Sequence, residues 1–416
     1  MRHFISIISI FISTLCFSQV TTSVETVIVD SGKYEFKLQA KKDTPNYSVA
    51  YRILTNQIIT NPKSAELHYF LGYTIDRLNA DDGKGMSQLK KEMSVKASEE
   101  FEEVNRLEPK YKGEQVLLDP YAKITSIWGS LAEFYLNKNL KDSAIWAFNE
   151  GRRRGGFMEP VLSFNRQLLN CCSKNSILIT FGDIVTIPLW YLQTIEKYRL
   201  DVTVVDANLI NTSWYPKYLK SERNLKIGFD NIAIDTIDYL QWKSTKITIE
   251  NPKSKGEKLS WTLKPSYLDN YILKGDRILL DLFKQNYFTR DMYFNSNSDT
   301  TYNLYLSNFF VDEGILDKVS LTPSNKKISN IKQYSIDSLT TNDILKSTTS
   351  IKLLGGYRWA YFIEITNLIN KQNFKQAKDL LVEMKQKFRV EKLPYATKQE
   401  EDYTKQLTDV IDQNYR

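Results

Sequence analysis

The sequence predicts a mixed α and α/β fold, in which repeated helical pairs flank one section built around a parallel sheet. Three observations lead to this prediction. Apolar residues recur at helical spacing towards both ends of the chain. Short apolar runs of strand length occur instead between about residues 177 and 348. A helical segment separates the first two of these runs, which is typical of neighbouring parallel strands because they need a crossover connection.

The 416 residues are enough for two or three domains of the usual size. Residues 4–17 are nearly all apolar or Ser/Thr and follow Arg2, a pattern typical of a secretory signal peptide. This run is shorter than the ~20 residues that a membrane helix needs. No later stretch is apolar enough to span a bilayer, so we expect an exported mature chain without a transmembrane segment, in the periplasm or cell envelope. The predicted sections are a signal peptide at 1–19, helical repeats at 20–165, an α/β domain at 166–348 and C-terminal repeat helices at 349–416.

Helical pairs are predicted on both sides of the α/β section. Small residues such as Gly72 and Ala144 stand where paired helices approach, and large residues such as Trp128 lie between them. This spacing resembles that of the tetratricopeptide repeat, of which about three units are needed for a stable array. The pairs cover residues 65–109, 128–151 and 357–384, and a half repeat covers residues 50–62.

The α/β section begins with the clearest pattern in the chain. Ile177–Ile179 form a buried strand that ends at Gly182, and a helix follows with Pro188 in its first turn. Val202–Val205 form the second strand, which places both strands in one Rossmann-like parallel sheet. The pattern further predicts strands at 226–229, 246–250, 259–263 and 292–294, a helix at 271–285 and irregular structure at 321–349.

Polar side chains collect where the first two predicted strands end. Open α/β sheets usually bind ligands at this carboxyl edge, so these side chains are our candidate ligand-binding residues. Asp183 has an alternative role as the cap of the following helix, and the sequence leaves both roles open. Trp214 is an aromatic platform for a sugar ring or, as its helical spacing favours, a core residue. The candidates are Asp183, Thr186, Asp206, Asn208, Asn211 and Trp214.

Histidine and cysteine usage restricts the chemistry of the chain. His3 and Cys16 lie in the predicted signal peptide, and His68 occupies a packing position of a repeat. Cys171 and Cys172 are adjacent, which disfavours a relaxed disulfide. We therefore expect no zinc site and no serine–histidine triad.

Charge and motifs exclude further classes of protein. The net charge of +7 is spread along the chain, and its one tight basic cluster, Arg152–Arg154, reads as a helix end, so we expect no nucleic-acid partner. No P-loop or dinucleotide-binding glycine motif occurs, so we expect no cofactor.

Two motifs in the α/β section carry a resemblance: GDIVTIPLWY at 182–191 and LINTSWY at 209–215. They are similar to the soluble C-terminal region of a bacterial membrane-protein family related to protein O-mannosyltransferases. The family has an Asn-Asp pair where this chain has Ile184 and Val185. Weaker matches at 278–281, at 290–294 and in the C-terminal helices extend the resemblance in patches over 176–395, without the membrane part where glycosyl transfer would occur. The resemblance implies an architecture more than an activity.

The sequence thus leads to two functional hypotheses. The first is an exported, non-catalytic binding or scaffold protein of the cell envelope, which holds a protein or peptide partner in a repeat groove and is linked to envelope glycosylation or surface-protein maturation. The alternative is a glycan-binding protein or carbohydrate-active enzyme with its site at the strand ends. Fold alone does not decide between them.

Overall fold

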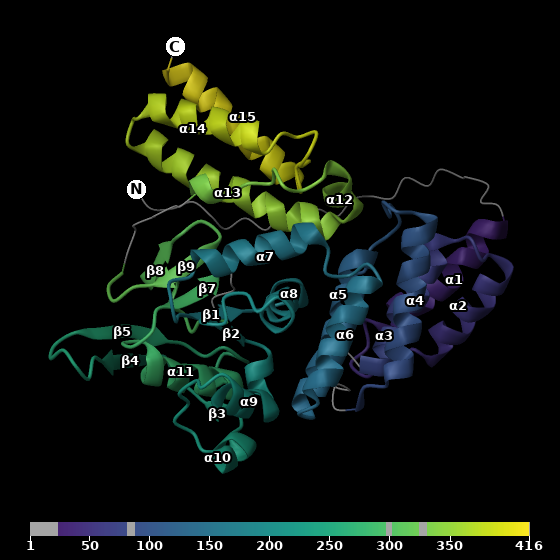
Figure 1. Cartoon of the computed structure of the whole chain (residues 1–416), viewed down its shortest axis with the longest axis horizontal. Helices are drawn as coiled ribbons and strands as arrows, with labels where there is room; N and C mark the ends of the chain where they lie inside the picture. The colour runs from purple at the N-terminus through teal and green to yellow at the C-terminus, as the bar shows by residue number, and fades with distance from the viewer. Residues whose placement is uncertain (1–23, 81–87, 297–301, 324–330, 416) are drawn as a thin grey trace.

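A computed structural model describes residues 24–80, 88–296, 302–323 and 331–415 (Figure 1). The predicted signal peptide at 1–19 lies outside these residues. In the described part of the chain, no helix is both long and apolar enough to cross a membrane.

Six helices form the N-terminal section. Each helix packs on the next one along the chain as far as α6, and Figure 1 shows them stacked side by side. Small residues allow the close approach: a Cβ on Gly72 would lie 2.8 Å from the Phe101 ring, and Ala144 is fully buried. The helices are α1 (Val24–Gln39), α2 (Ser48–Thr60), α3 (Ala65–Ala80), α4 (Lys91–Leu107), α5 (Pro120–Asn137) and α6 (Lys141–Arg153).

A five-stranded sheet follows α7 (Glu159–Cys171). Its order is β2-β1-β7-β9-β8. β1 and β2 run parallel, as the strand–helix–strand pattern predicts, and β7 pairs parallel with β1 on its other side. The sheet is not wholly parallel, because β8 and β9 are joined by a short turn at Gly314 (φ 96°), and so short a turn joins antiparallel strands. The strands are β1 (Ile177–Thr180), β2 (Thr203–Asp206), β7 (Met292–Asn295), β8 (Phe310–Asp312) and β9 (Leu316–Val319).

The crossover helix α8 (Asp183–Thr194) begins more than one turn before Pro188, which was predicted in its first turn. Pro188 therefore lies inside the helix, where it cannot donate to the carbonyl of Ile184. The side-chain amide of Asn165, a buried residue of α7, donates to that carbonyl at 3.4 Å. This bond from a neighbouring helix compensates for the one that the proline removes.

The segment between β2 and β7 holds shorter elements. The strands predicted at 246–250 and 259–263 are confirmed as β4 (Thr245–Glu250) and β5 (Lys258–Leu263), which pair as an antiparallel hairpin. The predicted strand at 226–229 is absent, because its backbone bonds to α11 side chains: Gly228 N–H donates to Asp281, and Asn286 donates to the Lys226 carbonyl. The other elements are α9 (Trp214–Glu222), α10 (Asn231–Thr236), β3 (Leu240–Gln241), β6 (Tyr271–Ile272) and α11 (Lys274–Asn286).

The C-terminal helices cover the sheet section from the side of α7. The long helix α13 packs on α7, α14 and α15 (Figure 1). Arg358 of α13 is buried and donates to the Glu400 carboxylate of α15 at 2.8 Å. The region predicted to be irregular contains α12. The helices are α12 (Thr341–Lys346), α13 (Thr348–Asn370), α14 (Phe374–Lys387) and α15 (Lys398–Asn414).

The helical and sheet sections share one apolar core. A continuous cluster of buried residues runs from Phe36 in α1 to Ile411 in α15. At the seam between the sections, α5 lies so close to α8 that a Cβ on Gly129 would stand 2.2 Å from Ile187. This contact places α5 beside the carboxyl edge of the sheet, where the candidate residues lie.

Candidate functional site

The six predicted residues lie at one edge of the sheet, but they do not form one cluster. The register pairs Thr180 at the end of β1 with Asp206 at the end of β2. Asp183 comes three residues after Thr180 and begins α8. Asp206 is buried, whereas Asp183 is exposed and bonds to the helical section.

Asp206 is a buried structural carboxylate. Asp206 is only 5% exposed, and Thr186 Oγ1 donates a hydrogen bond to its Oδ2 at 2.6 Å. The backbone N–H groups of Asn208 and Leu209 both donate to its Oδ1 at 2.8 Å. Burial raises the pKa of Asp206, although these hydrogen bonds act in the opposite direction. With both oxygens engaged, Asp206 fixes the turn after β2.

Asp183 is exposed and turned towards the helical section. It accepts a hydrogen bond from Ser126 Oγ of α5 at 2.6 Å. The cap residue of α8 is Gly182, whose φ of 86° suits glycine, and no side chain caps this end. The capping role considered for Asp183 is therefore wrong, because its carboxylate bonds to a neighbouring helix instead.

The remaining candidates surround the start of α9 and α11. Asn208 is exposed, and Asn211 accepts from the N–H of Gly275 at 2.8 Å. Asn211 also lines a cavity of about 240 Å³ beyond the end of β2, together with Asp276. Trp214 is half-buried and packs against aromatic residues of its own helix, with its ring 5.3 Å from that of Tyr215.

One acidic side chain at this edge escaped the sequence analysis. Glu133 belongs to α5, is only 7% exposed, and accepts no hydrogen bond from any residue that the structure describes. Burial, together with the charges of Asp206 and Asp183, raises the pKa of Glu133 to about 8. The repeat pattern gave no signal for it, because an acidic residue in a repeat helix reads as a solvated position.

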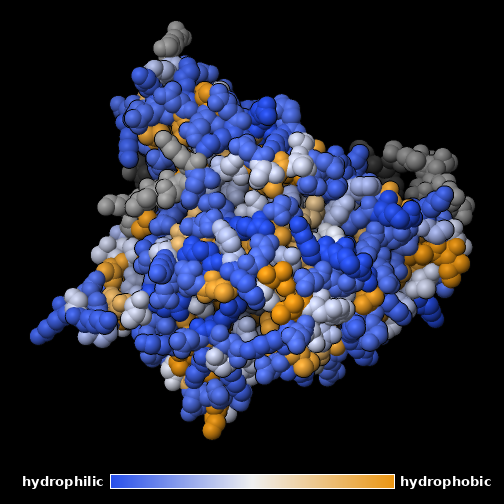
Figure 2. All heavy atoms as spheres, viewed as in Figure 1, coloured by the Kyte–Doolittle hydropathy of each residue, from blue (hydrophilic) through white to orange (hydrophobic). Residues whose placement is uncertain are grey.

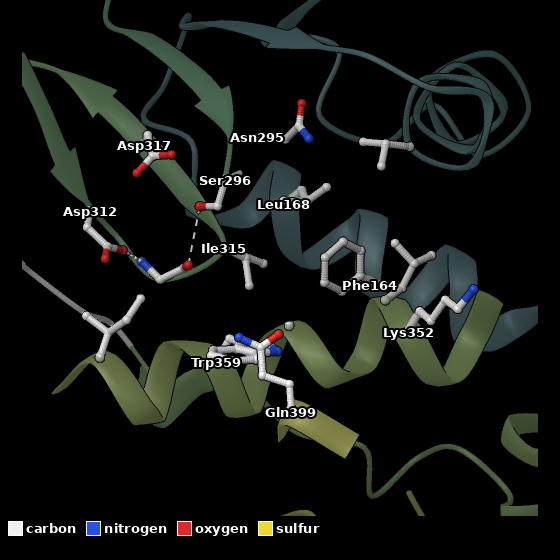
Figure 3. Close-up of a pocket in the computed structure, with 15 residues that line it drawn as sticks. Phe164, Leu168, Asn295, Ser296, Asp312, Ile315, Asp317, Lys352, Trp359 and Gln399 are labelled. Carbon is white, nitrogen blue, oxygen red and sulfur yellow. Dashed lines mark hydrogen bonds between the residues drawn. The ribbon is translucent and has the colours of Figure 1, made fainter. Parts of the chain in front are cut away.

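A larger cavity lies on the other side of β1. It measures about 500 Å³ and opens between the carboxyl end of β7 and the long helix α13 (Figure 3). Below, we call it the β7–α13 cavity. Its polar lining comes from Asn295, Ser296, Asp312, Asp317, Lys352 and Gln399, and its apolar lining includes Phe164, Leu168, Val185, Ile315, Gly356 and Trp359.

The position of this cavity follows from the strand order. The chain leaves β1 towards β2 on one side, whereas it leaves β7 towards β8 and β9 on the other. Such a change of direction between adjacent parallel strands opens a crevice at their carboxyl ends, where open α/β sheets bind ligands. None of the six predicted residues lines the cavity. The strand-end argument applied to the predicted strand at 292–294 would have pointed to Asn295 and Ser296.

Histidine and cysteine take structural positions. The ring of His68 is buried between Glu100, 2.6 Å from Nδ1, and the Pro62 carbonyl, 3.0 Å from Nε2. Cys171 and Cys172 are free thiols, and burial raises the pKa of Cys171 to about 11. Within the described ranges, no group of three His, Cys, Asp or Glu residues is arranged to hold a metal ion.

A comparison with protein families gives one match. The family model of TMEM260-associated domain 2 matches residues 161–226. No curated protein and no solved structure matches the chain. The matched stretch runs from α7 through β1, α8 and β2 to just beyond α9, and it contains all six predicted residues. This part of the chain is therefore similar to TMEM260-associated domain 2.

Proposed function

We propose that this chain is an exported, non-catalytic binding or scaffold protein of the cell envelope, whose helical pairs hold a protein or peptide partner. We interpret the pairs α3–α4, α5–α6 and α13–α14 as tetratricopeptide-like units. Arrays of such units bind peptide segments or partner helices along their surfaces. The continuous packing of α1 to α6 supports this interpretation.

The observation that carries the proposal is the apolar surface of α1 and α2. Ile59 is 74% exposed and Tyr34 is 66% exposed, and Leu38, Val49 and Tyr51 are exposed as well. Figure 2 shows hydrophobic residues gathered over α2. A concentration of large apolar side chains in water on two packed helices is typical of a protein-binding surface.

The link to glycosylation rests on the matched domain. TMEM260 is a protein O-mannosyltransferase, and the matched stretch is named for its association with it. We propose that the chain takes part in envelope glycosylation or surface-protein maturation by binding a component of that process. The engaged oxygens of Asp206 support a structural role for this residue over a catalytic one.

Site-specific photo-crosslinking in the native cells tests the proposal. A photoreactive residue at Ile59 is expected to give one discrete adduct with an envelope protein. The same residue at Ile232 of α10, which is 75% exposed, is the matched control and is expected to give none. Equal adducts at both positions, or none at either, would contradict the proposal.

Export is tested separately. N-terminal sequencing of the chain from the envelope fraction is expected to start near Gln19 or Val20. Recovery of an intact Met1, or of a lipid on Cys16, would overturn that part of the proposal.

A second candidate function is favoured by the cavities at the carboxyl edge of the sheet. Two cavities open there, of about 240 and about 500 Å³, and the larger is within the size range of small-molecule sites. This observation supports a glycan-binding protein or a carbohydrate-active enzyme with a strand-end site.

A further inference from the structure

We propose that the β7–α13 cavity is a binding site for an uncharged, hydroxyl-rich ring, that is, one sugar unit of a glycan. The inference rests on the second candidate function and deepens it, because it assigns the site and the class of ligand. The residues that line this cavity differ from the six candidates predicted from the sequence, although both groups lie at the carboxyl edge of the sheet.

The first supporting observation is a glycine, Gly356, at a position where the packing of neighbouring atoms does not require glycine. Gly356 lies in the middle of the 23-residue helix α13, where glycine is less favourable than alanine by about 1 kcal/mol. A Cβ on Gly356 would meet Phe164 at 3.6 Å, an ordinary contact, so neighbouring atoms leave room for a methyl group. The missing side chain instead leaves the wall of the cavity open. A local preference that is broken without a packing gain is typical of a functional site.

The second observation is a polar atom without a partner. The side-chain Oδ1 of Asn295 is buried and has no hydrogen-bond partner among the described residues. Leaving such a group unpaired costs about 1–3 kcal/mol. Asn295 stands at the end of β7 beside Ser296 and lines the cavity (Figure 3). A rotation of its amide towards a ligand hydroxyl would give this oxygen a partner and remove the cost.

The lining favours a neutral ligand over an anion. Asp312 and Asp317 are cross-strand partners in β8 and β9 and bring two carboxylates, which accept hydrogen bonds from hydroxyl groups. Among the described residues that line the cavity, Lys352 is the one basic residue, whereas phosphate and carboxylate ligands are usually held by several Arg or Lys side chains.

An aromatic residue completes the site. Trp359 lies on the α13 side of the cavity (Figure 3). The ring of Tyr403 in α15 stacks on it with ring centroids 5.8 Å apart. This contact fixes the indole, whose apolar surface suits the C–H face of a sugar ring. Hydroxyl acceptors on the sheet side and an aromatic ring on the helix side match the two faces of such a ligand.

Binding measurements on the full mature chain test the inference. The probes are methyl α-D-mannopyranoside, methyl β-D-glucopyranoside and, as an anion, glucose 6-phosphate, followed by saturation-transfer NMR and calorimetry. We expect saturable binding of at least one neutral glycoside, and weaker binding of glucose 6-phosphate. Gly356→Leu, which places a side chain in the cavity, and Asn295→Ala are each expected to weaken binding by about tenfold or more.

Two variants serve as controls. Gly356→Ala adds a methyl group that the packing accommodates, so it is expected to raise the melting temperature and to confirm that the helix tolerates side chains at this position. Trp214→Ala removes the aromatic residue predicted from the sequence, which does not line the cavity, and is expected to leave binding unchanged. If Gly356→Leu fails to fold, Asn295→Ala carries the test.

The outcomes distinguish failure of the glycan-binding function from failure of the cavity assignment. If glycosides bind equally well to wild type, Gly356→Leu and Asn295→Ala but not to Trp214→Ala, the glycan-binding function stands and the cavity assignment is wrong. If wild type binds no glycoside, both the second candidate function and the cavity assignment fail. Tighter binding of glucose 6-phosphate than of either neutral glycoside would overturn the class of ligand.

Discussion

The hydroxyl of Ser126 donates a hydrogen bond to the carboxylate of Asp183 at 2.6 Å, and this bond joins the helical section to the start of α8. It lies beside the close approach of Gly129 to Ile187, so polar and apolar contacts together fix α5 against the sheet section. Asp183 thereby has a structural partner at the edge where ligand binding was predicted.

Asp183 and Asp206 are expected to respond differently to alanine. Asp183→Ala should cost about 1 kcal/mol of unfolding free energy, because it removes one acceptor at an exposed position. Asp206→Ala should cost about 3 kcal/mol or more, because the Thr186 hydroxyl and two backbone N–H groups lose their acceptor. Urea denaturation measures both. Equal costs, or a larger cost for Asp183→Ala, would contradict the assigned contacts.

A conservative variant of Asp183 addresses ligand binding. The Ser126 bond can persist in Asp183→Asn, since the amide oxygen still accepts it, so this variant should be nearly as stable as wild type. If the sugar unit binds in the β7–α13 cavity, Asp183→Asn also keeps glycoside affinity. Loss of binding in Asp183→Asn without loss of stability would mean that the ligand binds at the candidate residues predicted from the sequence and not in the β7–α13 cavity.

Glu133 gives a pH-dependent prediction. Its pKa is about 8 in the folded protein against an ordinary value of 4.5, so the folded state holds a proton that the unfolded chain releases. The stability that this proton contributes is complete below about pH 4.5 and declines as the pH rises towards 8. At 1.36 kcal/mol per pKa unit, Glu133→Gln should stabilise the protein by several kcal/mol at pH 8 and change little at pH 4.5.

Thermal unfolding of wild type and Glu133→Gln across this pH range measures the difference. Asp206 also has a raised pKa and acts in the same direction, so the variant should lose part, not all, of the pH dependence. Parallel curves for the two proteins at every pH would mean that Glu133 is ionised in the folded state.

Ala144 tests the packing of the helical pairs. It is fully buried in α6, which packs on α5, and a tryptophan there has no room. Overpacking costs typically ~1–3 kcal/mol, so Ala144→Trp should lower the melting temperature. Asn149→Trp places the same side chain at an exposed position of α6 and should be close to neutral. An unchanged melting temperature for Ala144→Trp would contradict the observed packing.

Arg358 tests the attachment of the C-terminal helix. Its guanidinium is buried and donates to Glu400 and to the Phe388 and Pro394 carbonyls. Arg358→Met leaves the buried Glu400 carboxylate without its counter-charge, which should cost about 3–5 kcal/mol. Changing both residues, Arg358→Met with Glu400→Gln, should recover part of that loss. No recovery in the double variant would show that packing, not charge, accounts for the effect.

The sequence was sufficient to predict the helices and strands whose apolar residues follow a clear pattern. The apolar runs at 177–179, 202–205 and 292–294 each became a parallel strand, because strands buried on both faces read as continuous apolar segments. Residues 310–319 were missed, since β8 and β9 are short, half-buried and interrupted by acidic residues. The start of α8 was misplaced because the bond that tolerates Pro188 comes from Asn165 of another helix.

The candidate cavities could be predicted from the sequence only as far as the edge of the sheet. The strand-end rule led to the correct edge for the cavities, but the walls of the larger one come from segments far apart in sequence. Gly356 and Trp359 belong to a helix whose spacing predicts packing alone. These two residues line the same cavity as Asn295 because α13 packs on α7. This packing joins segments far apart in the chain, so a local sequence pattern does not predict it.

The central claim is that the apolar surface of α1 and α2 binds an envelope partner. The most direct measurement is the affinity of the purified mature chain for the partner captured at Ile59, compared with the variants Ile59→Asp and Ile232→Asp. A charge placed in an apolar interface should weaken binding by about tenfold or more for Ile59→Asp, while Ile232→Asp should bind like wild type. Equal affinity of Ile59→Asp and wild type would contradict the claim.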